Sequence, residues 1–175
     1  SLGGAFYITT EMQRDKTNIL NKLSHFIANE AVDGGAFYLK SISNIKNLYT
    51  NYKLNVAHRS GGSLWVERLV QFENYNLMAT NNSANDFGGF VYNKATRFYR
   101  NFNCTFKSNT ARRGGSFYLS GFKFVCYNGS TFVGNSAVED GGVMYIINVD
   151  KVQGDTSLFQ YNSALDGHGG VFSIR

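Results

Sequence analysis

Residues 132–145 decide the fold, and they read Phe132-Val133-Gly134-Asn135-Ser136-Ala137-Val138-Glu139-Asp140-Gly141-Gly142-Val143-Met144-Tyr145. The pattern is F-x-x-N-x-A-x-x-x-G-G-x-h-Y, where h is an apolar residue, and variants of it recur along the chain. The glycine pairs begin at residues 3, 34, 61, 88, 114, 141 and 169, so their intervals are 31, 27, 27, 26, 27 and 28 residues. A period of this length predicts a solenoid.

Most repeats carry three short apolar runs, and none shows helical periodicity. One run follows the glycine pair, one contains the F-x-x-N motif, and a third lies between them at residues 69–72, 96–99, 122–125 and 147–149. Three strands of about four to six residues fit a repeat of about 27 residues. We therefore expect an all-β, right-handed parallel β-helix of about six coils. Residues 1–175 form a single β-helix segment in this interpretation, as part of a longer repeat protein, and residues 11–17 form a surface loop in the longest repeat.

Alignment on the second glycine separates core positions from outer ones. The second and fourth residues after it are mostly apolar and are expected to point into the core, because side chains alternate along a strand. The third residue is aromatic in six repeats. This predicted aromatic row consists of Tyr7, Tyr38, Trp65, Tyr92, Tyr118 and Tyr145. Strands of successive coils lie about 4.8 Å apart, so these rings can stack on the exposed face, where they either bind sugars or a partner or only stabilise the stack.

One asparagine recurs at the same corner of every repeat. The predicted ladder consists of Asn29, Asn55, Asn82, Asn109, Asn135 and Asn162. A side-chain amide both donates and accepts, so each asparagine can bond to the coils above and below it. We expect this column to be structural.

Charged residues follow the motif alanine by two positions. They are Asp33, Arg59, Asp86, Arg113, Glu139 and Asp166. Their sign alternates through the first five, and opposite charges on neighbouring strands stabilise a register. Glu139, Asp140 and Asp166 are the one acidic cluster that the sequence brings together, and a salt-bridged corner is weighed there against a calcium site.

The remaining reactive residues show no catalytic pattern. His25, His58 and His168 fall in different registers, and no nucleophile accompanies them. Cys104 and Cys126 do not share a column, which leaves both a disulfide and two buried thiols open. We predict no catalytic residue, no cofactor and no metal site. Because parallel β-helices also carry polysaccharide lyases and hydrolases, a carbohydrate-active enzyme or its glycan-binding domain is the alternative.

The net charge and composition of the chain indicate which kinds of partner to expect. A net charge of +5 permits an acidic partner, and the absence of proline alongside 19 glycines suits strands that share one hydrogen-bonded ladder. The sequence contains no run of 18 apolar residues, so no transmembrane segment is predicted. The predicted partners are proteins or further copies of the chain, at the coil ends or the aromatic row, and possible glycans; no nucleic-acid partner is expected.

The pairing of F-x-x-N at Phe26-Ile27-Ala28-Asn29 with G-G-A-h at Gly34-Gly35-Ala36-Phe37 resembles the repeat of chlamydial polymorphic outer membrane proteins. Similar repeats occur in large surface proteins of some protists. The resemblance covers nearly the whole chain, although the alanine after the glycine pair is replaced in most later repeats. It implies a non-catalytic structural or adhesive element at the cell surface or in an extracellular filament.

Overall fold

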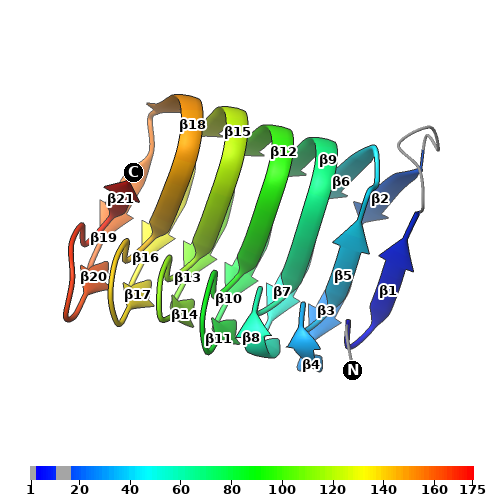
Figure 1. Ribbon diagram of the computed structural model, residues 1–175, viewed down its shortest axis with the longest axis horizontal. Coiled ribbons are helices and arrows are strands. Elements are labelled where there is room, and N and C mark those ends of the chain that lie inside the picture. The colour runs from blue at the N-terminus through cyan, green and yellow to red at the C-terminus, as the bar shows by residue number, and fades with distance from the viewer. Residues whose placement is uncertain (1–2, 11–16) are drawn as a thin grey trace.

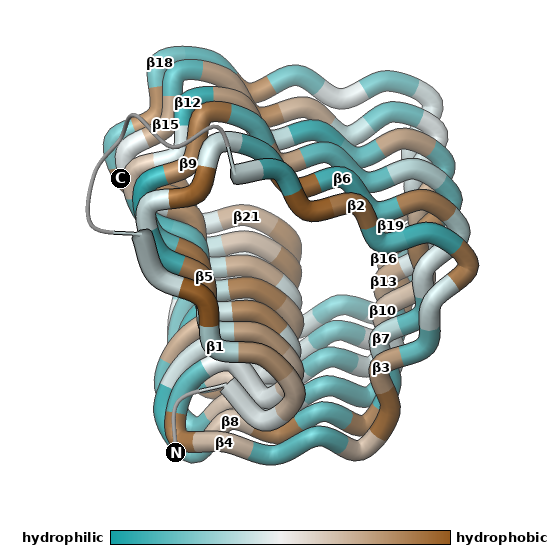
Figure 2. The backbone as a smooth tube through the Cα atoms, turned by 90° about the vertical axis from the view of Figure 1, so that its right-hand side faces the viewer, coloured by the Kyte–Doolittle hydropathy of each residue, from teal (hydrophilic) through white to brown (hydrophobic). Residues whose placement is uncertain are grey.

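The computed structural model describes residues 3–10 and 17–175, and all its regular structure is β-strand. The chain winds into a β-solenoid of about six coils, in which every strand pairs in parallel with the equivalent strands of the neighbouring coils (Figure 1). In the view from the N-terminal end, the chain runs clockwise as it recedes, which makes the solenoid right-handed (Figure 2). The predicted parallel β-helix is confirmed. Most of the loop predicted at residues 11–17 lies outside the described residues.

Three parallel sheets form the walls of the solenoid. The first, called here the bent sheet, contains β1 (Phe6–Thr9), β2 (Asn18–Lys22), β5 (Phe37–Lys40), β6 (Asn44–Leu48), β9 (Leu64–Tyr75), β12 (Val91–Phe102), β15 (Phe117–Asn128), β18 (Met144–Asp155) and β21 (Phe172–Ile174). The second contains β3 (His25–Ile27), β7 (Asn51–Lys53), β10 (Met78–Thr80), β13 (Thr105–Lys107), β16 (Thr131–Val133) and β19 (Leu158–Gln160). The third contains β4 (Glu30–Asp33), β8 (Val56–Ser60), β11 (Ser83–Ala84), β14 (Thr110–Ala111), β17 (Ser136–Ala137) and β20 (Ser163–Ala164).

The strands that make up the three sheets differ from the three strands per repeat that the apolar runs predict. The run after the glycine pair and the run at residues 69–72 belong to one bent strand, β9, and the next three coils repeat this arrangement. The third sheet is formed instead by the short segments between the ladder asparagine and the glycine pair. The bent strands persist because a single residue with positive φ turns the chain at residues 68, 95, 121 and 148.

Every coil turns at single residues in the left-handed region. The first glycine of each pair has positive φ, and so do residues at three other equivalent positions of the coils. In one coil these three residues are Arg68, Asn76 and Asn81. Proline cannot adopt positive φ, and it has no N–H to donate to the next coil. This explains why the chain turns without proline.

Glycine is required at these pairs because the backbone of another residue lies too close for a side chain and because the first glycine has positive φ. A Cβ on Gly89 would lie 2.2 Å from the carbonyl oxygen of Gly115 and 2.5 Å from that of Thr110. Its partner Gly88 has a φ of +64°, where a Cβ would meet the Val91 carbonyl oxygen at 2.1 Å. Successive coils therefore approach each other at this corner with no space for a side chain.

The core fills the inside of the solenoid. Phe117 of the bent sheet packs against Phe106 and Phe132 of the second sheet. Tyr99 lies between Phe117 and Phe72 in the same buried cluster. The predicted inward columns are confirmed in the coils between the two ends, where residues such as Phe37, Leu64 and Met144 are buried.

Candidate functional site

The predicted aromatic row forms along the first half of the bent sheet. Equivalent residues pair in register from β1 to β18, so that each ring stands over the next. The ring centroids are 5.1, 4.2, 5.6, 5.0 and 5.5 Å apart from Tyr7 through Tyr38, Trp65, Tyr92 and Tyr118 to Tyr145, all stacked. Parallel strands impose this spacing, because it follows the distance between neighbouring coils.

The expectation that the row is exposed is wrong for most of its length. Tyr7 at the edge coil has 56% of its surface exposed, whereas Tyr145 has 3%, and the four rings between them are half-buried. The guanidinium groups of Arg113 and Arg175 lie 5.7 and 5.6 Å from the Tyr145 ring centre and cover it. Phe87 projects from the third-sheet corner onto Tyr118, with 4.7 Å between their ring centroids. Long side chains from neighbouring columns therefore hide rings that strand alternation alone would leave open.

Burial also affects the phenols of the row. It raises the pKa of Tyr38, of Tyr92 and of Tyr118, and the neighbouring phenol in the stack raises each pKa further. These hydroxyls are therefore neutral donors and acceptors at physiological pH. Such groups can bind sugars or protein surfaces, and they have no nucleophilic character.

The predicted asparagine ladder is confirmed. From Asn55 onward, each side-chain oxygen accepts from both the backbone N–H and the amide of the asparagine one coil earlier, as Asn109 Oδ1 does from Asn82 at 3.1 and 2.9 Å. Each amide from Asn55 onward also donates to a backbone carbonyl of the preceding coil, as Asn109 Nδ2 does to Ala79 at 3.0 Å. The ladder is therefore polar, because the donors that join one asparagine to the next all point toward the C-terminal end.

The structure contains a second asparagine ladder that was not predicted from the sequence. Asn21, Asn47, Asn74 and Asn101 are joined by amide-to-oxygen hydrogen bonds of 2.8, 2.7 and 2.7 Å inside the bent sheet. Each lies eight residues before a member of the first ladder, and this constant offset was the available signal. In the next coil Tyr127 takes the position, and the Asn101 amide has no partner within the described chain.

The alternating charges do not form one column. The structure pairs Arg113 with Phe87 and aligns Asp33 with Ser60, because the loop before the glycine pair differs in length between coils. Ion pairs between neighbouring coils form nevertheless. Arg59 Nε donates to Asp33 at 2.9 Å, and Arg112 lies 3.6 Å from Asp86 and 3.6 Å from Glu139. The predicted partner of Asp86 was Arg113, and the one observed is Arg112.

The acidic cluster is a salt-bridged corner. Glu139 Oε2 lies 2.6 Å from Arg113 Nε, and Asp140 Oδ2 accepts from Arg175 at 3.0 Å. Within residues 3–10 and 17–175, no group of three or more His, Cys, Asp or Glu side chains is arranged to hold a metal ion. The interpretation of Glu139, Asp140 and Asp166 as a calcium site is therefore wrong, because guanidinium groups already neutralise the first two.

The cysteines and histidines are dispersed, as predicted. Cys104 and Cys126 are both free and buried, and burial raises the pKa of Cys104 to about 11. His58 lies 2.6 Å from Glu30, and His25 and His168 lie on the exposed surface. Two buried neutral thiols and separated imidazoles give no nucleophile and base in contact.

Comparisons with known proteins return no relative. No family model, no curated protein and no solved structure matches the chain. The described residues contain no helix that is long and apolar enough to cross a membrane. Function must therefore be inferred from the residues of the solenoid itself.

Proposed function

We propose that the chain is a non-catalytic structural or adhesive element that acts at a cell surface or in an extracellular filament. It interacts through its two coil ends and through the side of the solenoid. The resemblance of its repeats to chlamydial surface-protein repeats supports this placement. So do the carboxylates, most of which are held by basic side chains one coil away, such as Glu73 by Arg100 at 3.0 Å.

The polarity of the asparagine ladder is the observation that carries the proposal. At the C-terminal end, the Asn162 backbone N–H has no acceptor among the described residues. At the N-terminal end, Asn29 Oδ1 has no donor there, since Asn29 only donates to Asn55. Each inner asparagine joins these two kinds of group. A second copy stacked on the first would join them across the junction in the same way.

The apolar columns of the core would also continue across a junction between two stacked copies. Phe6 begins a column that is buried from Phe37 onward, and Phe172 ends it. The open edges are β1, β2, β3 and β4 at one end and β19, β20 and β21 at the other. Unpaired parallel strands over exposed core side chains favour addition of another coil. Because the two ends differ, contacts between copies of this segment would be head-to-tail.

Sedimentation velocity across a range of protein concentrations tests this association. We expect the average mass of the wild-type chain to rise with concentration, and Ile174→Lys to prevent the rise, because Ile174 is 56% exposed on the end coil and a lysine there would be buried at the junction. Met78→Lys is the matched control, because Met78 is 50% exposed on the side of the second sheet. A monomer at every concentration, or equal effects of the two lysines, would contradict the proposal.

A further inference from the structure

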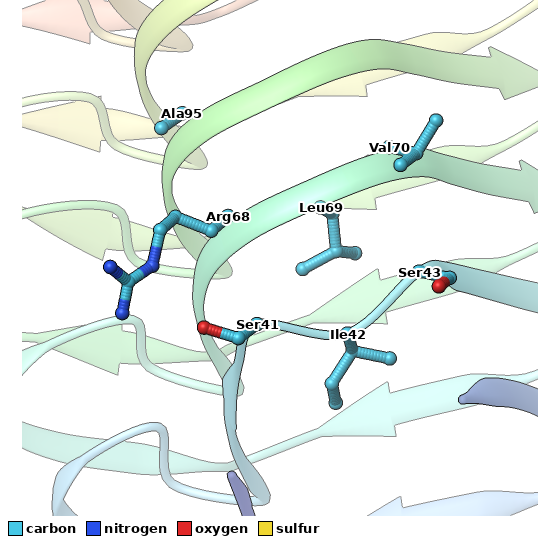
Figure 3. A pocket seen from close by; sticks show the side chains of 7 residues that line it. All are labelled: Ser41, Ile42, Ser43, Arg68, Leu69, Val70 and Ala95. Atoms are coloured by element: carbon cyan, nitrogen blue, oxygen red, sulfur yellow. The ribbon is translucent and has the colours of Figure 1, made fainter. Parts of the chain in front are cut away.

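A groove runs along the side of the solenoid where the bent strands turn. Two adjoining cavities of about 380 Å³ each share Leu69 and Ala95, and together they extend across four coils, from Ser41 to Gly121. The corner residues with positive φ line the groove, and all except Arg68 are small. Figure 3 shows the Arg68 side chain reaching outward from the corner, while Leu69 and Ile42 form the apolar wall between two coils. We call this the corner groove.

Cationic side chains border the corner groove on its open side. Arg97 and Lys123 line it at equivalent positions of β12 and β15, and both are exposed. Neither forms an ion pair with an acid in the described chain. On β18, Lys151 is in register with Phe124, and its ammonium lies 5.6 Å from the centre of the Phe124 ring. These three residues are the cationic strip.

Most acids near the cationic strip are held by other basic side chains, and one acid, Asp150, lies beside the strip. Glu73 is held by Arg100 at 3.0 Å, and Glu67 lies between Lys40 and Arg68 at 3.8 and 3.6 Å. Asp150 is exposed on β18 and takes the position of Lys123 one coil later, so it offsets part of the charge at that end, whereas no acid among the described residues forms an ion pair with Arg97 or Lys123.

The spacing of the strip suits a linear polymer with repeated negative charge. Arg97 and Lys123 occupy neighbouring coils, so their backbones lie about 4.8 Å apart along the solenoid axis. Like charges at this distance repel each other, and an anion placed along them relieves the repulsion. A partner with charges along one direction would therefore follow the groove.

Aromatic rings beside these cations favour a sugar polymer. Phe98 and Phe124 are half-buried neighbours in register, and the guanidinium groups of Arg97 and Arg100 lie 5.3 and 5.0 Å from the Phe98 ring centre. The exposed part of such a ring offers an apolar face for the C–H side of a pyranose, while the adjacent cations bind its acidic substituents. We propose that the corner groove and the cationic strip bind an acidic polysaccharide, sulfated or rich in uronic acid. This site is separate from the coil ends and does not depend on end-to-end association.

Fluorescence anisotropy with labelled dextran sulfate fragments tests the proposal, with neutral dextran and polythymidylate of equal length as the other probes. We expect the wild-type chain to bind dextran sulfate, to ignore neutral dextran and to bind polythymidylate more weakly. Arg97→Gln combined with Lys123→Gln should lower the affinity about tenfold, at about threefold for each exposed charge pair.

Lys53→Gln combined with Lys107→Gln is the matched control. These exposed lysines lie on β7 and β13 of the second sheet, away from the groove, and their loss changes the net charge by the same amount. We expect this control to lose less than about threefold. Equal losses in the two double variants, no binding of dextran sulfate at low salt, or tighter binding of polythymidylate would overturn the proposal. Circular dichroism of each variant verifies that the fold is retained.

Discussion

Replacing one inner rung of the asparagine ladder should destabilise the solenoid strongly. In Asn109→Ala, the buried backbone N–H of Asn82 loses its acceptor, and the Asn109 amide bonds to Asn135 and to the Ala79 carbonyl disappear. An orphaned buried N–H costs about 1–3 kcal/mol and each lost bond about 0.5–1.5 kcal/mol. We therefore expect the free energy of unfolding to fall by about 2–6 kcal/mol.

The first rung provides a matched control of the same residue type. Asn29 is only partly buried, and no side chain or backbone group in the described chain donates to its Oδ1. Asn29→Ala should therefore cost about 1 kcal/mol, because only its donated bond is lost. Urea titration followed by the fluorescence of Trp65, the only tryptophan, measures both variants. Equal losses of stability at Asn29 and Asn109 would refute the ladder as a source of stability.

A charged variant separates the amide hydrogen bonds from simple packing. Asn109→Asp keeps the size of the side chain but turns an oxygen toward Asn135 Oδ1, which accepts from the amide at 3.1 Å in the wild type. A buried carboxylate has a raised pKa in the folded state, so its cost should shrink as the pH falls through that pKa toward about 4. A cost that does not change between pH 7 and pH 4 would show that the amide donor is unimportant.

Three further predictions concern other parts of the coil. Gly89→Ala should prevent stable folding, because its Cβ would lie 2.2 Å from the Gly115 carbonyl oxygen, and loss of the β-sheet circular dichroism signal tests it. Asn93→Val with Thr96→Val should raise the melting temperature, since these buried residues hydrogen-bond at 2.6 Å but leave the Asn93 amide nitrogen without a partner. Cys104 has its pKa raised by burial to about 11 from 9.0, so its contribution to stability is complete below pH 9 and is lost as the pH rises toward 11. Chemical unfolding should show about 1.4 kcal/mol less stability at pH 10 than at pH 7, and Cys104→Ala should remove this part of the loss.

Repetition made the fold and one ladder predictable. A period near 27 residues, an aromatic residue three places after six of the seven glycine pairs, and one asparagine per repeat require only that successive coils stack in register. The second ladder was equally available from its constant offset, since Asn74 precedes Asn82 by the same eight residues that separate Asn47 from Asn55.

By itself, then, the sequence determined that the coils stack in parallel and which columns face the core, because strand periodicity and repeat length are local properties of the chain. The tertiary structure alone decided what covers each column. Loops of unequal length moved Arg113 out of register with Asp86, and neighbouring side chains buried Tyr145 while leaving Arg97 and Lys123 exposed. Exposure depends on which long side chains from adjacent columns lean over a given site, and no spacing within one repeat encodes that.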